Sequence, residues 1–281
     1  MSLETGIFKD KQNRGVAEYF DAESSYWNAL YDGNDVMAAI YQQRRSIALR
    51  SFDELSLSKE AQILEVGCGA GLLTADLARR GYTIEALDRV KSMVDLTRRN
   101  ALKSGVENRI NTHIGDVCQM PFRDGTFRCL IALGVTPWVI DISKAMKELS
   151  RVLVPGGYAI ITADNRHRLN HLLDPTHMPA LAGLKGRMKS ALEKFRLRKP
   201  SREPDVHRYT LKEFNRLLKS VGLVGIKHHM IGFGPFSFCR YGLLSDTMGI
   251  KLHHLLQRYS NRGSLVLRST GSQFLVVATK S

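Results

Sequence analysis

The order of apolar and polar positions between residues 61 and 163 predicts an alternation of strands and helices. Short apolar runs at 63–66, 82–88, 109–114, 127–133 and 158–163 predict five β-strands. Between the first three strands, and again before the fifth, the apolar residues recur at helical spacing, as in the stretches that begin at Leu72, Met93 and Ile142. Strands that alternate with helices indicate an α/β fold with a parallel sheet.

Two longer segments interrupt this pattern in the second half of the chain. Residues 164–208, rich in His, Pro, Lys and Arg, predict a first insertion, and residues 231–270 predict a second. Between them an amphipathic helix over 211–222 leads to a sixth strand over 223–230, and residues 272–280 form the seventh. We therefore expect one domain over 61–281 that carries both insertions.

The first sixty residues predict a separate helical cap over 1–60. Its aromatic residues are dense, which is typical of a packed core, but a pocket wall above the sheet is the alternative. These residues are Tyr19, Phe20, Tyr26, Trp27 and Tyr31.

The turn after the first strand reads ILEVGCGAGLL and contains three alternating glycines. A dinucleotide site requires G-x-G-x-x-G, and the third glycine is replaced by Leu72 in one register and by Thr74 in the other. Glu65, two residues before Gly67, would repel a pyrophosphate, whereas it could accept hydrogen bonds from the ammonium of an amino acid that carries a sulfonium. The turn therefore favours a cationic ligand.

Three further motifs follow this turn in order. Asp88 ends the second strand, IGDVCQMPFRDGTF spans 114–127, and LSRVLVPGGYAIIT spans 149–162. Together with the glycine turn they resemble the class I S-adenosylmethionine-dependent methyltransferases over 61–162, most of all the small-molecule group. The resemblance implies a Rossmann-like, doubly wound sheet of seven strands, six parallel and the last antiparallel, with S-adenosylmethionine as cofactor.

The resemblance also implies which residues hold this cofactor. Asp88 stands where a carboxylate can accept from both ribose hydroxyls. In the family the acidic residue at Asp116 accepts from the adenine amino group, and the next residue, Val117, donates its backbone N–H. The implied binding residues are Glu65, Gly67, Cys68, Gly69, Gly71, Asp88, Arg89, Asp116, Val117 and Leu133.

Catalysis by such an enzyme does not require a dedicated base, because alignment and water exclusion supply much of the acceleration. If the acceptor is a hydroxyl, His207 and Tyr209, just before the helix at 211, are the candidate catalytic residues. His167, His171 and His177 could hold a metal with Asp164 and Asp174, but the surrounding Lys and Arg disfavour a cation, and we expect no metal.

The formal net charge is +14, and residues 185–202 carry eight Lys or Arg against Glu193 alone. A solvated face explains such a segment, and so does an anionic substrate, a membrane surface or nucleic acid. An RNA methyltransferase is therefore the alternative, although LGVTPW at 133–138 replaces the Asn-Pro-Pro-aromatic motif of base amino-methylating enzymes. A binding protein that keeps the fold without catalysis is a third hypothesis.

Residues 241–263 of the second insertion space apolar side chains at helical intervals, flanked by Lys251, His254, Arg258 and Arg262. Such a helix could close the substrate pocket or lie on an anionic membrane.

The first residues lack the apolar stretch of a signal peptide, and the four cysteines form no C-x-x-C pair. We expect a cytoplasmic enzyme, with peripheral contact at the inner membrane face left open. Its expected acceptor is a small molecule or a lipid- or glycan-linked molecule. The charge of the acceptor, the atom that is methylated and the oligomeric state of the enzyme are left open.

Overall fold

The computed structural model describes residues 15–173, 206–238 and 241–281. Seven strands form one twisted sheet in the order β3-β2-β1-β4-β5-β9-β6. Their bounds are β1 Ile63–Val66, β2 Ile84–Asp88, β3 Ile110–Ile114, β4 Phe127–Ala132, β5 Leu153–Asp164, β6 Leu223–Ile231 and β9 Gln273–Lys280. β9 runs antiparallel to both β5 and β6, and the other pairs are parallel. The predicted doubly wound sheet with an antiparallel last strand is confirmed.

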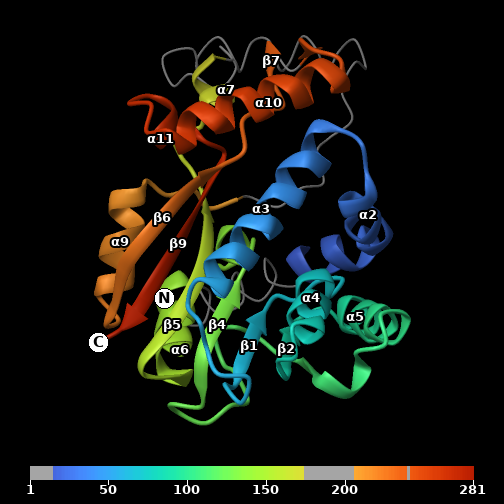
Figure 1. Ribbon diagram of the computed structural model, residues 1–281, viewed down its shortest axis with the longest axis vertical. Coiled ribbons are helices and arrows are strands. Elements are labelled where there is room, and N and C mark those ends of the chain that lie inside the picture. The colour runs from blue at the N-terminus through green and yellow to red at the C-terminus, as the bar shows by residue number, and fades with distance from the viewer. Residues whose placement is uncertain (1–14, 174–205, 239–240) are drawn as a thin grey trace, which may run out of the picture.

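Helices cover both faces of this sheet (Figure 1). One face packs against α6 Ile142–Val152 and α9 Leu211–Lys219 through residues such as Leu130, Leu149 and Phe214. The other face packs against α3 Val36–Asp53 and α4 Leu72–Arg79, where Ile131 faces Phe52 and Leu77 within one core cluster. Neighbouring residues of β4 thus serve opposite cores, as the two-residue period of a strand requires. Helix α5 Lys91–Lys103 packs beside α4.

Two details differ from the sequence prediction. β5 begins at Leu153 rather than at residue 158, because Phe127 pairs with Leu153 and Cys129 with Tyr158, so that residues 154–157 bulge out of the ladder. The expected helical cap contains α2 Ser24–Ala29 and α3, and α3 buries Ile47 and Phe52 in the main core. The division into 1–60 and 61–281 stays a prediction.

The second insertion forms a layer at one end of the molecule, where the carboxyl ends of the parallel strands lie (Figure 1). It consists of the short pair β7 Ser237–Phe238 and β8 Tyr241–Gly242, then α10 Asp246–Asn261 and α11 Leu267–Thr270. α7 Leu169–Leu173, after β5, lies in the same layer. Within the part of the chain that is described, no helix combines the length and the apolar composition needed to cross a membrane.

Candidate active site

The glycine turn joins β1 to α4 and has the left-handed backbone that glycine favours. Gly67, Gly69 and Gly71 have φ values of 68°, 55° and 74°. The N–H groups of Gly67 and Cys68 donate to the carbonyl of Leu87 at 2.7 and 3.1 Å, so the turn is fastened to the end of β2. The predicted strand, turn and helix are therefore all present.

The three glycines serve different purposes. A Cβ at Gly69 would meet no atom within 4 Å, and this residue lines the central cavity. A Cβ at Gly67 would clash with Val135, and one at Gly71 would lie 2.7 Å from the side chain of Thr97. Of the three glycines that the resemblance implies for cofactor binding, Gly69 leaves room for a ligand, whereas Gly67 and Gly71 allow close packing of the protein itself.

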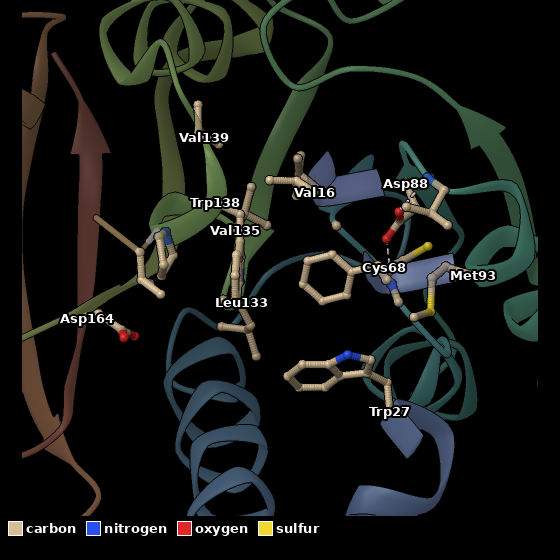
Figure 2. Close-up of a pocket in the computed structure, with 18 of the residues that line it drawn as sticks. Val16, Trp27, Cys68, Asp88, Met93, Leu133, Val135, Trp138, Val139 and Asp164 are labelled. Carbon is tan, nitrogen blue, oxygen red and sulfur yellow. Dashed lines mark hydrogen bonds between the residues drawn. The ribbon is translucent and has the colours of Figure 1, made fainter. Parts of the chain in front are cut away.

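Asp88 projects from the end of β2 into the same cavity (Figure 2). Its two oxygens accept from the N–H groups of Gly69 and Val90, both at 2.9 Å. Burial raises the pKa of this carboxyl above its ordinary value. An ionised carboxylate has about four acceptor sites, so two remain for the hydroxyls of a ligand.

Glu65, on β1, also lines the cavity and is only 4% exposed. It accepts a hydrogen bond from the hydroxyl of Thr74 on α4. Burial raises the pKa of Glu65 to about 8. Glu65 forms no ion pair with the described residues, so a ligand ammonium would be held there.

The remaining predicted cofactor residues also lie at this cavity. Arg89, Asp116, Val117, Leu133 and the backbone around Cys68 are among its lining. A guanidinium nitrogen of Arg89 lies 3.6 Å from a carboxylate oxygen of Asp116, whose other oxygen accepts from the N–H of Cys118 at 2.8 Å. The Cys68 thiol lies 3.4 Å from the Thr97 hydroxyl, and burial raises its pKa, which leaves it unreactive. Gly71 is the exception, since it is not part of the cavity lining.

The cavity has a volume of about 1120 Å³, more than one drug-sized ligand requires. Aromatic side chains of the N-terminal segment form part of its wall, which confirms the pocket-wall alternative for them. Tyr19 stacks on Trp138 with ring centres 5.9 Å apart, and Phe20 meets Trp138 edge-on at 5.1 Å. Figure 2 shows Trp27 and Trp138 on opposite sides of the space beside Asp88.

A buried cation that the motifs did not indicate lies on α3. Arg44 is 5% exposed, lines the cavity, donates to the Tyr31 hydroxyl at 3.1 Å and lies 4.2 Å from the centre of the Tyr41 ring. Among the described residues, its Nε has no hydrogen-bond partner, and no carboxylate pairs with Arg44 within 4 Å. Burial without an ion-pair partner is costly, so Arg44 is suited to an anionic ligand group. The sequence offered one indication of this site, because Arg44 is a basic residue at a position of α3 that faces the core.

Beyond Arg44, polar residues from β5, α7 and β9 line the cavity around Asp164. Asp164 accepts from Arg168 at 2.6 Å and from the amide of Gln273 at 3.0 Å. Its carboxylate lies across the cavity from Asp88 (Figure 2). From the sequence, Asp164 was considered only as a metal ligand. Its place in the cavity could not be predicted, because its neighbours in space come from three distant segments.

The two candidate catalytic residues are not brought to this cavity. His207 is exposed, and its backbone N–H donates to the carbonyl of Pro137 at 2.8 Å. Tyr209 packs its ring against Phe214 in the core at 5.7 Å, and neither side chain is part of the cavity lining. Among the residues described, no three His, Cys, Asp or Glu side chains are placed to hold a metal ion, and His177 and Asp174 lie outside that part.

Comparison with known proteins agrees with this geometry. A methyltransferase domain family matches residues 64–161. The sterol 4-C-methyltransferase of Caenorhabditis elegans is 26% identical over 70% of this chain, which spans 60% of that enzyme's length. The ubiquinone/menaquinone biosynthesis C-methyltransferase UbiE of Geotalea daltonii is 26% identical over 78% of this chain and 92% of its own.

Solved structures support the fold. The magnesium protoporphyrin IX methyltransferase of Synechocystis, crystallised with S-adenosylhomocysteine, superposes with a TM-score of 0.64. The superposition covers 96% of this chain and all of that enzyme, at 15% identity. The matched domain, the seven-stranded sheet with its antiparallel last strand, and the cavity at the glycine turn place this chain among the class I S-adenosylmethionine-dependent methyltransferases.

Proposed function

We propose that this protein transfers the methyl group of S-adenosylmethionine to a bulky, largely apolar small molecule. One observation carries the proposal: the open side of Gly69 lies beside two acidic side chains in a cavity large enough for two ligands. When bound, the cofactor supplies a methyl group already activated for displacement by a nucleophile.

The chain's own residues divide the work of holding the cofactor. Asp88 would accept from the ribose hydroxyls, and Asp116 and the N–H of Val117 would meet the adenine. Glu65, once ionised, and Arg44 would carry opposite charges at the same cavity, so they suit the ammonium and the carboxylate of the methionine portion. Both charged ends of a zwitterionic ligand would then be matched. A dinucleotide does not carry this pair of charges.

The acceptor would occupy the part of the cavity between the aromatic wall and Asp164. The rings of Tyr19, Phe20 and Trp138 exclude water and offer flat apolar surfaces. Asp164 is the carboxylate there that could orient an acceptor hydroxyl and hold its proton. One named relative is a sterol methyltransferase and another is a C-methyltransferase of ubiquinone/menaquinone biosynthesis, and the ring systems of sterols and quinones suit such a wall.

Attachment of the acceptor to a lipid or glycan is compatible with the same proposal, which does not depend on peripheral contact with a membrane. The RNA alternative depends on the basic segment 185–202, which lies outside the described residues, and the comparisons give it no support. The third hypothesis, a binding protein that keeps this fold without catalysis, can be tested only by a turnover assay.

Calorimetry with S-adenosylhomocysteine and, separately, with NADH is the first test. We expect micromolar binding of the former and none of the latter; the reverse would move the chain to another enzyme class. Methyl-labelled S-adenosylmethionine, incubated with the protein and a panel of sterols, quinols and porphyrins, then tests the acceptor class. Label in water-soluble RNA but in no apolar acceptor would contradict the proposal.

A further inference from the structure

Helix α10 is docked on the molecule through its polar residues. Gly249, His253, Gln257 and Ser260 are its buried positions. The amide of Gln257 donates to the carbonyl of Met230 at 2.7 Å and accepts from the N–H of Gly232 at 3.1 Å. Nδ1 of His253 accepts from the N–H of Phe233 at 3.2 Å. Hydrogen bonds to the chain that leaves β6 therefore fix this helix.

Three apolar residues of α10 face away from the core, whereas Ile250, Leu252 and Leu256 are partly buried. Met248 is 58% exposed, Leu255 42% and Tyr259 50%, and Leu265 and Val266, just beyond the helix, are more exposed still. A helix on the surface of a globular protein normally turns its apolar stripe toward the core. The outward face of α10, defined by Met248, Leu255 and Tyr259, has no such cover from the described chain.

Basic side chains lie on the same side of α10. Lys251, Arg258 and Arg262 are exposed, and with Leu255 they follow one another at spacings of four, three and four residues, which places them in one row on the helix. None of them pairs with a carboxylate of the described residues. Residues 241–272 contain four Lys or Arg and one acidic residue, Asp246. The outward face is thus apolar and cationic at once.

We propose that the outward face of α10 docks on the surface of a bilayer that contains acidic lipids. Met248, Leu255 and Tyr259 enter the boundary between headgroups and acyl chains, while Lys251, Arg258 and Arg262 meet the acidic headgroups. Charge complementarity selects this partner, because a neutral apolar surface would leave three cations without counter-charges.

Docking there would bring the cavity close to the bilayer. Gly249 of α10 packs against Val36, the first residue of α3, and Met37 and Tyr41 of α3 line the cavity. Gly234 and Pro235, between β6 and β7, line it as well. An apolar acceptor could pass from the bilayer into the cavity beside α3. This delivery step depends on the proposed function, whereas the docking itself does not.

Flotation of the full chain with vesicles tests the docking. We expect the protein to float with vesicles of 70% phosphatidylcholine and 30% phosphatidylglycerol at low salt, and to stay behind with phosphatidylcholine alone or at 1 M salt. Two triple variants, Met248→Ser/Leu255→Ser/Tyr259→Ser and Lys251→Gln/Arg258→Gln/Arg262→Gln, should each lower the partition coefficient roughly tenfold or more. Because all six side chains are exposed, the variants should keep the wild-type thermal unfolding temperature and affinity for S-adenosylhomocysteine.

Matched controls are available on other faces. Lys147→Gln/Lys212→Gln/Lys219→Gln removes three exposed cations from α6 and α9, and Leu102→Ser/Ile226→Ser removes two exposed apolar residues from α5 and β6. Both controls should float like the wild type. Unchanged flotation of the α10 variants, or failure of the wild type to float, would overturn the proposal. A dimer that the serine variant dissociates would assign the face to a second copy of the chain. Cofactor binding is measured separately, so these outcomes leave the proposed function intact.

Discussion

At the residue scale, Gly69 and Gly71 form a natural matched pair. Both have a left-handed backbone, so alanine at either position should lower the free energy of unfolding by about 1–2 kcal/mol. Gly71→Ala also places a methyl group against Thr97 and should lose about 1–3 kcal/mol more, whereas Gly69→Ala meets only open space. Gly69→Ala should instead weaken binding of S-adenosylhomocysteine at least tenfold.

Denaturant unfolding and calorimetry on the same two variants separate these effects. Equal stability of both variants would mean that Gly71 does not serve packing. Wild-type cofactor affinity in folded Gly69→Ala would place the ligand elsewhere.

The buried carboxyl of Glu65 makes a pH-dependent prediction. With its pKa raised to about 8, Glu65 is protonated in the free protein at pH 7. A bound ammonium favours the ionised form and lowers this pKa, so binding releases a proton. Affinity for S-adenosylhomocysteine should therefore rise with pH, by up to about tenfold per unit below pH 8, and level off above it.

Titration calorimetry in buffers of different ionisation enthalpy counts the released proton. Glu65→Gln is the matched variant, because its amide keeps the shape and can accept from Thr74. It should bind more weakly at pH 8 and lose both the slope below pH 8 and the proton release. If wild type and Glu65→Gln show the same dependence between pH 6 and 8, Glu65 does not meet the ammonium.

At the scale of elements, the docking of α10 should weaken in acid. His253 is fully buried, and burial lowers its pKa to about 4, with Nδ1 accepting from Phe233. A depressed folded-state pKa contributes stability that is present above pH 6.5 and is lost as the pH falls toward 4, at about 1.4 kcal/mol per unit. The protection factors of α10, which are its hydrogen-exchange rates corrected for the slower intrinsic exchange in acid, should fall over that range while those of the sheet stay high.

His253→Gln offers a neutral acceptor in place of the imidazole and should flatten this dependence. His254, exposed on the next position of α10, provides the control substitution His254→Gln. If α10 has the same protection factors at pH 7 and pH 4.5, His253 does not fix the helix.

The elements also show which features were accessible from sequence. Strand and helix periods predicted the seven strands, and the glycine turn predicted the cofactor end of the cavity, because both are properties of short stretches. The direction of α10 was not predictable from its apolar spacing, since Gln257 and His253 turn it by bonding the chain after β6. The far end of the cavity was missed because Arg44, Asp164 and Gln273 meet only when α3, β5 and β9 assemble.

At the scale of the whole molecule, the structure separates the first sixty residues into two parts with different roles. Residues 15–34 supply the aromatic cavity wall, including Tyr19, Phe20 and Trp27. Helix α3 begins after Asp35, whose carboxylate accepts from the N–H of Ala38 at 2.7 Å, and buries Ile47 and Phe52 beneath the sheet. The first part serves the site, and the second belongs to the core.

Two truncations test this division against a single cap over 1–60. Residues 35–281 keep the α3 cap and should unfold cooperatively near the wild-type temperature, with S-adenosylhomocysteine bound more weakly and acceptor methylation abolished. Residues 61–281 lose the buried Ile47, Leu49 and Phe52, worth about 1.5–3 kcal/mol each, which together approach the whole stability of a domain. That fragment should show no cooperative thermal transition in circular dichroism. Cooperative folding of 61–281 would instead restore the boundary at residue 60 and make α3 a dispensable cover.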